Sequence, residues 1–198
     1  MTVDEAQEKF VEIFTENIHR DGSENLLDWL ITTDFFTAPA SSKFHSAYEG
    51  GLCEHSINVF DRYVRLLTME YGENFTNKIS MESVAIIALL HDLCKVNFYK
   101  VDYRNVKVDG QWTQQPYYTI DDTLPYGHGE KSVYIISGFM RLTREEAMAI
   151  NWHMGGFDAR VAGGASWVMS DAYYQYPVAT LCHMADFMAT YLDEKPAE

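Results

Sequence analysis

Histidine and aspartate residues recur along this chain within segments whose apolar residues repeat at helical spacing. Four such segments and one glycine-flanked turn carry the set, which comprises His55, His91, Asp92, His128, His153 and Asp186. A lone inward-facing histidine is more often a hydrogen-bonded core residue than a ligand. Burying each of these groups without partners would cost several kcal/mol, whereas one shared metal ion satisfies them together. The combination therefore predicts a metal centre.

The ligands of this predicted centre are imidazole nitrogens and carboxylate oxygens. Such a mixture suits divalent ions such as Mn, Fe, Co, Ni, Zn or Mg better than ions that prefer thiolates, and it does not single out one of them. The ligand spacing of a zinc finger is not found in the chain. We expect one or two divalent ions whose identity the sequence leaves open.

Two predicted helices hold the first candidate ligands. The helix expected for 52–71 places His55 on its apolar face. A second helix, 80–95, begins with an almost unbroken apolar run and carries His91 and Asp92 near its end. An imidazole and a carboxylate would thus reach the core together.

A third predicted helix begins with the pattern of a capping box. Thr143 is followed three residues later by Glu146, so each side chain can satisfy a free backbone amide of the other residue. The helical period then places His153 on the inner face, and Gly155-Gly156 ends the helix. The glycine-rich stretch 161–164 is predicted to be a loop.

Pro177 suits the first turn of a last helix, in which Asp186 lies on the buried face. Helical spacing also predicts packing helices within about residues 3–35 and a further helix after His128, up to about residue 141. The predicted helices therefore account for most of the chain.

The segment from about 98 to 120 differs, because it is rich in tyrosine, valine and threonine. Asp109-Gly110 at its middle is a strong turn signal, so we predict a β-hairpin. Pro116 restricts the second strand to an edge position. The hairpin could cover a site as a flap, or it could be an insertion with a structural role alone, and the segment fits both alternatives.

These elements define an all-α fold class, a helical bundle with a β-hairpin insertion at about 98–120. The 198 residues fit one domain, with N-terminal packing helices at about 3–35 and a catalytic core at about 39–190. No internal repeat or linker indicates a second domain.

Composition restricts the partners of the chain. The formal net charge is −14 and the fifteen lysines and arginines form no block, so long nucleic acid is a poor partner. A small phosphorylated substrate stays possible because a bound metal can dominate the local field. No signal peptide or membrane span is expected. Cys53, Cys94 and Cys182 do not form a disulfide pattern, which favours a reducing cytoplasm.

The order and spacing of His55, then His91-Asp92, then Asp186 resemble the H…HD…D signature of the HD-domain phosphohydrolase superfamily. The sequence around and before His55 is similar to the corresponding segment of HD-domain 3′→5′ exoribonucleases. The matching residues are Pro39-Ala40, then Phe44 to Tyr48, then Gly50 to Ser56. The resemblance covers about Pro39 to Asp186. It implies a helical domain that binds divalent metal and cleaves phosphate esters or nucleotides.

Those exoribonucleases also have histidines between the HD pair and the last aspartate. His128 and His153 occupy the corresponding places here, which implies a second metal position that shares Asp92. The relatives commonly have two adjacent histidines where this chain has His153-Met154, so we expect a weaker or substrate-completed second site. We expect no oligonucleotide-binding module beside this domain, which argues against a direct transfer of RNA degradation.

The resemblance and the helix patterns together suggest roles near the substrate. Lys95 lies one helical turn beyond His91 and would contact the phosphate, although a surface lysine at a helix end is an equal alternative. His45, Lys131 and His183 are further candidates for substrate contact, and His183 could instead simply pack.

We therefore expect a metal-dependent phosphohydrolase that cleaves a nucleotide or similar small substrate with metal-activated water, with Asp92 and Lys95 as its catalytic residues. One alternative is a nuclease or phosphodiesterase acting on short oligonucleotides or cyclic nucleotides, whose bases would stack on hairpin aromatics. Another is a metal-binding, nucleotide-sensing module with little catalysis. A homo-oligomer is compatible with each alternative.

Overall fold

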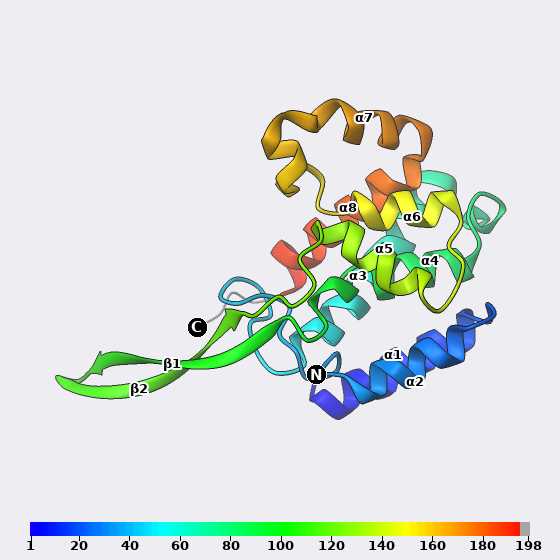
Figure 1. Ribbon diagram of the computed structural model, residues 1–198. Coiled ribbons are helices and arrows are strands. Elements are labelled where there is room, and N and C mark those ends of the chain that lie inside the picture. Colours follow the sequence, from blue (N-terminus) through cyan, green and yellow to red (C-terminus); the bar gives the residue numbers. More distant parts are fainter. Residues whose placement is uncertain (195–198) are drawn as a thin grey trace.

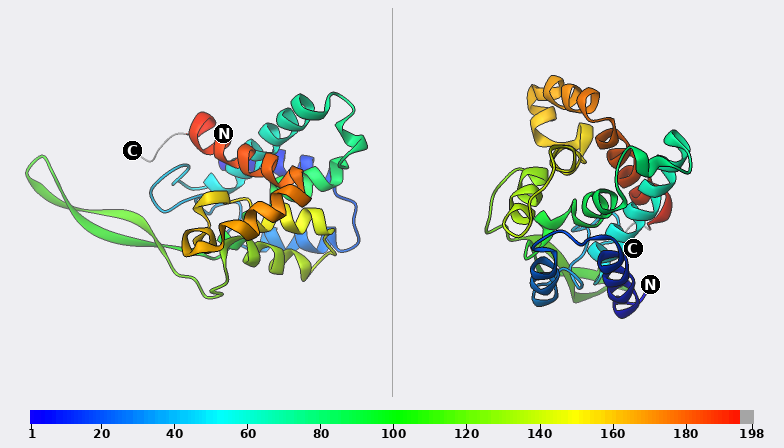
Figure 2. Two further views of the ribbon diagram at one scale, coloured as in Figure 1. Left: turned by 90° about the horizontal axis from the view of Figure 1, so that it is seen from above. Right: turned by 90° about the vertical axis from the view of Figure 1, so that its right-hand side faces the viewer.

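The structure is a computed structural model that describes residues 1–194. This part of the chain is mostly helical, and one long antiparallel hairpin extends away from the helical body (Figure 1). The left view of Figure 2 shows the same projection from above. The helices that carry the candidate ligands pack together at the opposite end of the molecule from the hairpin tip.

Two N-terminal helices form as the sequence predicts. α1 (Val3–Asn17) begins in a capping box between Thr2 and Glu5, and α2 (Ser23–Thr32) begins after Gly22. α1 packs against α3 and α4, and both helices contribute buried apolar residues to one continuous core. They act as packing elements.

The helical body is built around α4 (Met81–Leu90). Every residue from 84 to 90 is buried, as expected of a helix that is hydrophobic all round. Its neighbours are α3 (Gly51–Tyr71) and α6 (Arg144–Asn151), and α8 (Pro177–Met188) packs against both of these. α5 (His128–Ser137) covers the end of α4 through η2 (Leu93–Lys95).

The hairpin consists of β1 (Tyr99–Val108) and β2 (Gln111–Ile120), paired along their whole length. Asp109 and Gly110 both have positive φ angles, 49° and 85°, which fits the predicted tight turn. The sequence prediction of a hairpin is therefore confirmed, and because the sheet has two strands Pro116 lies on an edge.

Helix α4 ends earlier than predicted. It stops at Leu90, and His91 and Asp92 occupy a turn before the short 3₁₀ helix η2. Adjacent residues of an α-helix point about 100° apart. The non-helical backbone of Asp92, at φ −104° and ψ 20°, lets its carboxylate lie beside the His91 ring.

The prediction of a loop at 161–164 is wrong. Val161–Ala165 forms a π-helical turn, η4, which accommodates Gly164 at φ 103° and leads into α7 (Ser166–Gln175). Ala172 alone of the α7 residues is buried. Because α7 has no apolar stripe, its sequence carries no amphipathic signal.

Of the remaining short helices, two connect larger ones and the last follows α8. They are η1 (Phe75–Asn77), η3 (Gly155–Phe157) and η5 (Ala189–Asp193). Within residues 1–194, no helix is both long and apolar enough to cross a bilayer.

Candidate metal centre

Six side chains from five parts of the chain meet at the ends of the central helices. His55 comes from α3, His91 and Asp92 from the turn after α4, His128 from the start of α5, His153 from the turn after α6, and Asp186 from α8. The side chains of His55, His91, Asp92 and His153 are at most 2% exposed. Asp186 and His128 are 15% and 29% exposed, so solvent reaches the centre on their side.

Backbone carbonyls fix the orientation of two of the imidazole rings. Nδ1 of His91 donates to the Ala88 carbonyl at 2.8 Å, and Nδ1 of His153 donates to the Ile150 carbonyl at 2.7 Å. A carbonyl only accepts, so in the neutral ring the proton lies on Nδ1 and Nε2 carries a free lone pair. Both Nε2 atoms point into the cluster. This is the tautomer that a metal ligand needs.

The distances among the first group of atoms match those of ligands around one ion. His55 Nε2 lies 3.2 Å from His91 Nε2, 3.5 Å from Asp92 Oδ2 and 3.3 Å from Asp186 Oδ1. Ligand atoms at about 2.0 to 2.2 Å from an ion lie about 2.9 to 3.5 Å from one another. The spacing therefore fits a cation at the centre of the group.

A second group of atoms surrounds the other carboxylate oxygen of Asp92. Oδ1 lies 2.9 Å from His128 Nε2 and 3.4 Å from His153 Nε2. The His153 nitrogen is buried and has no hydrogen-bond partner. A buried nitrogen without a partner is costly unless an ion or water satisfies it. Asp92 therefore lies between two groups of possible ligands.

Cys94 belongs to this second group, although the sequence analysis considered it only as one of three cysteines without a disulfide pattern. Its Sγ lies 3.3 Å from His128 Nε2 and 3.8 Å from Asp92 Oδ1. Burial raises the pKa of the Cys94 thiol, so the thiol is protonated near neutral pH. Cys94 follows Asp92 by two residues, and this short separation is the sequence feature that could have indicated the contact.

The buried charges of the centre also favour a cation. Asp92, Asp186 and Glu194 supply three carboxylates, and Lys95 supplies one ammonium, so with neutral histidines the net charge is −2. Burial alone would lower the pKa of His55, but Glu194 and Asp186 raise it to about 10. A proton on His55 thus offsets part of the charge that a divalent ion would neutralise.

Lys95 is part of the centre and not a surface residue. Its ammonium group donates to Asp92 Oδ2 at 2.6 Å, and its side chain is 10% exposed. Burial opposes the charge on Lys95, but Asp92 raises the pKa of the amine above its ordinary value. The alternative of a surface lysine at a helix end is therefore wrong.

Glu194 is a further member of the centre that sequence reasoning missed. Oε1 accepts from Nδ1 of His55 at 2.7 Å, and Oε2 accepts from the Ser46 hydroxyl at 2.8 Å. A carboxylate on the distal ring nitrogen fixes the tautomer and orientation of a histidine ligand. Glu194 follows η5 and is 139 residues from His55, so no local pattern indicates the contact.

The three candidate substrate residues have different surroundings. The His45 ring lies beside the His55 ring, tilted by 45° with ring centroids 5.1 Å apart, and burial lowers the pKa of His45 to about 4. Lys131 is buried and pairs with Asp122 at 2.5 Å near the hairpin base. Nδ1 of His183 donates to the His153 carbonyl at 2.7 Å, so this side chain positions the backbone of a ligand.

Comparison with known proteins gives no relative from which to assign the centre. The chain matches no protein-family model, no curated protein and no solved structure at the significance required. What is established is a helical fold with a buried cluster of histidine, aspartate and cysteine side chains that could hold a metal ion. Its chemistry is argued below from these residues.

Proposed function

We propose that this chain is a metal-dependent phosphohydrolase of the HD-domain type that acts on a nucleotide or similar small phosphorylated substrate. The observation that carries the proposal is the convergence of four imidazole Nε2 atoms and two aspartates at ligand spacing. The order of His55, His91-Asp92 and Asp186 along the chain is the order of the HD signature.

The two groups around Asp92 would divide the ligands between two positions. His55, His91, Asp92 and Asp186 would hold the first divalent ion. Asp92 with His128 and His153 would contribute to the second. A divalent ion bound here would supply a water of lowered pKa and would polarise a phosphoryl oxygen.

The side chains of the protein support phosphate chemistry in two further ways. Lys95 places a positive charge beside Asp92, where it can offset negative charge on the phosphoryl oxygens. The partly exposed side chains of Asp186 and His128 leave one side of the centre open for the substrate. The other ligands are buried, so water reaches the centre mainly from the substrate side.

A small substrate is favoured over long nucleic acid. The chain carries a formal net charge of −14, and the buried lysines of this region are already paired with Asp92 and Asp122. A polyanion would need many free cations along its path. One phosphate group needs the metal centre and one nearby ammonium.

The test compares two aspartates that are each paired with a buried lysine. Asp92→Ala removes the carboxylate shared by both ligand groups, whereas Asp122→Ala removes the partner of Lys131 outside the centre. We expect elemental analysis to show about one or two ions in the wild type and in Asp122→Ala, and none in Asp92→Ala. Phosphate release should follow the metal content.

Phosphate release should be measured on mononucleotides, cyclic nucleotides and short oligonucleotides with Mn, Co, Ni or Mg added. If the protein is active only on oligonucleotides, the proposed activity on nucleotides is wrong and the protein is a nuclease. Lys95→Gln keeps a hydrogen-bond donor for Asp92 but loses the charge, so we expect it to retain the metal and to lose about 100-fold in kcat/KM. A wild type that binds metal but releases no phosphate would be a sensing module, and a metal-free wild type would overturn the proposal.

A further inference from the structure

The hairpin formed by β1 and β2, which we call the arm, has two faces of different composition. Residues paired across antiparallel strands point to the same side, so the register assigns every side chain to a face. The apolar face consists of Tyr99, Val101, Tyr103, Asn105, Lys107, Trp112, Gln114, Pro116, Tyr118 and Ile120. The polar face consists of Lys100, Asp102, Arg104, Val106, Val108, Gln111, Thr113, Gln115, Tyr117 and Thr119.

The apolar face is uncovered along most of its length. Its side chains at Val101, Tyr103, Trp112 and Ile120 are 53%, 61%, 71% and 61% exposed. Within residues 1–194, no element packs over this face beyond the arm base, where Tyr99 and Tyr118 are partly buried. An isolated two-stranded hairpin is marginally stable in water, and a row of exposed aromatic residues marks an interaction surface.

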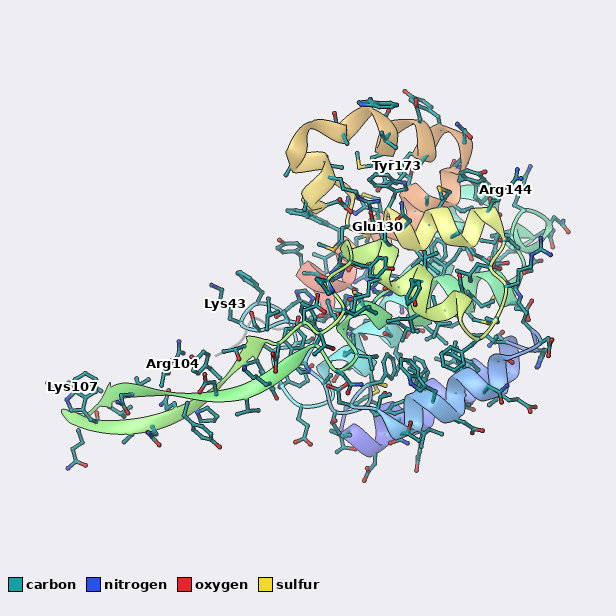
Figure 3. All side chains as sticks on the ribbon, viewed as in Figure 1. Lys43, Arg104, Lys107, Glu130, Arg144 and Tyr173 are labelled. Carbon is teal, nitrogen blue, oxygen red and sulfur yellow. The ribbon has the colours of Figure 1, made fainter. Side chains whose placement is uncertain are left out.

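The charges of the arm favour a protein partner of acidic character. Residues 99–120 carry Lys100, Arg104 and Lys107 against Asp102 and Asp109, a net charge of +1, so the rest of the chain carries −15. Figure 3 shows Arg104 and Lys107 on the arm, well away from the helical body. The acidic body of a second copy attracts such an arm. A nucleic-acid backbone would need several cations, and Lys107 is the one cation of the apolar face.

The area of the arm decides how two copies would meet. Ten residues per strand at about 3.3 Å per residue and a width of about 10 Å give about 330 Å² for one face. Two arms packed only on each other would bury about 660 Å², which is in the range of crystal contacts. Two arms that each pack on the body of the other copy would bury about 1,300 Å², above the roughly 1,000 Å² of a specific interface.

We propose that this protein is a symmetric homodimer in which the apolar face of each arm packs on the helical body of the other copy. A two-fold dimer repeats the contact twice, which closes the assembly and leaves no free arm. The proposal concerns the arm and stands independently of the chemistry at the metal centre.

The experiment measures molar mass by light scattering on the purified full chain at micromolar concentration. One variant combines Val101→Glu with Trp112→Glu on the apolar face. The matched control combines Val106→Glu with Tyr117→Glu, which makes the same kinds of change on the polar face. We expect twice the chain mass of 22.8 kDa for the wild type and the control, and the mass of one chain for the apolar-face variant.

A second variant removes the arm, so that loss of the dimer cannot be attributed to a misfolded hairpin. Tyr99 and Ile120 are register partners, so an Asn-Gly turn can join them in place of residues 100–119. Retained helical circular dichroism and the mass of one chain are expected. A monomeric wild type, a dimer that survives removal of the arm, or equal loss of the dimer in both double variants would overturn the proposal. So would a monomer whose apolar face instead binds single-stranded nucleic acid.

Discussion

The imidazole of His55 is held at both of its nitrogen atoms. Nε2 faces the other ligands, and Nδ1 donates to Glu194, which is itself held by Ser46. The side chain of Glu194 is 1% exposed, so its charge is poorly screened by solvent. This arrangement makes Glu194 a positioning residue for the candidate ligand.

Replacing Glu194 with glutamine should weaken metal binding without abolishing it. Glutamine keeps the shape of the side chain but loses the charge that orients His55, and such changes cost about 10- to 100-fold in affinity. Competition with a chromophoric chelator measures the dissociation constant. The matched control is Asp193→Asn, which breaks the neighbouring ion pair with Arg62 and should leave the affinity unchanged. Equal affinities in the two variants would show that Glu194 has no such role.

The turn after α6 holds His153 through two close contacts. Gly155 has φ 53°, and a Cβ placed there would lie 2.4 Å from the His183 ring. His183 in turn donates to the His153 carbonyl. The glycine therefore permits the close approach of α8 to the backbone of a candidate ligand.

Gly155→Ala should destabilise the fold and weaken metal binding. The left-handed conformation alone costs a residue with a Cβ about 1 to 3 kcal/mol, and the contact with His183 adds to this. Gly156→Ala is the control, since a Cβ there would meet nothing within 4 Å. Its unfolding free energy should stay within about 0.5 kcal/mol of the wild type. Urea titration measures the unfolding free energy of both variants. Similar values for Gly155→Ala and Gly156→Ala would argue against a constrained turn.

A largely buried ion pair joins the connection between α1 and α2 to α4 and α6. Glu146 accepts from both terminal nitrogens of Arg20, at 2.6 and 2.9 Å, and from the Ser83 hydroxyl at 2.7 Å. It also completes the predicted capping box with Thr143. The side chain of Glu146 is fully buried, so its loss leaves Arg20 with Glu82 as its remaining acidic partner.

Glu146→Ala should lower the unfolding free energy at pH 7 by about 3 kcal/mol, because it breaks a buried pair. Burial opposes the charge on Glu146, but Arg20 and Ser83 lower its pKa below the ordinary value of 4.5. A lowered carboxyl pKa stabilises the fold above the unfolded value, and this contribution is lost as the pH falls through the folded value. The difference in unfolding free energy between the wild type and Glu146→Ala should therefore become smaller below about pH 4.5. Urea titrations at pH 7 and pH 4 test this, with Glu145→Ala as the control.

At the scale of the whole molecule, the candidate metal centre joins α3, α5 and α8 to the turns after α4 and after α6. Without an ion, the buried carboxylates repel one another and the His153 nitrogen lacks a partner. A bound ion would therefore stabilise the folded chain, because the unfolded chain has no such site.

Removal of the metal should lower the melting temperature. An ion at 100 times its Kd stabilises the fold by about 2.7 kcal/mol, and for a chain of this size 1 kcal/mol shifts Tm by about 2 to 4 °C. We expect a chelator to lower Tm by about 5 to 10 °C and to leave Asp92→Ala unaffected. A Tm that is independent of chelator in the wild type would indicate a structural network without metal.

The sequence by itself determined the features that depend on neighbours along the chain. Helical period placed His55 and Asp186 on inward faces, and Thr143 with Glu146 marked a helix start. Asp109-Gly110 defined the hairpin because the required positive φ angles are local. Spacing and residue type also selected the six candidate ligands, which the structure brings together.

Only the tertiary structure decided how distant segments meet. The end of α4 at Leu90 and the burial of Lys95 depend on the packing of α5 against η2. The contact of Glu194 with His55 depends on η5 lying beside α3, which no periodicity encodes. Helix α7 has no apolar stripe, so its pattern carried no signal. Periodicity reports the direction of a side chain from its own helix, whereas packing decides which partner it finds there.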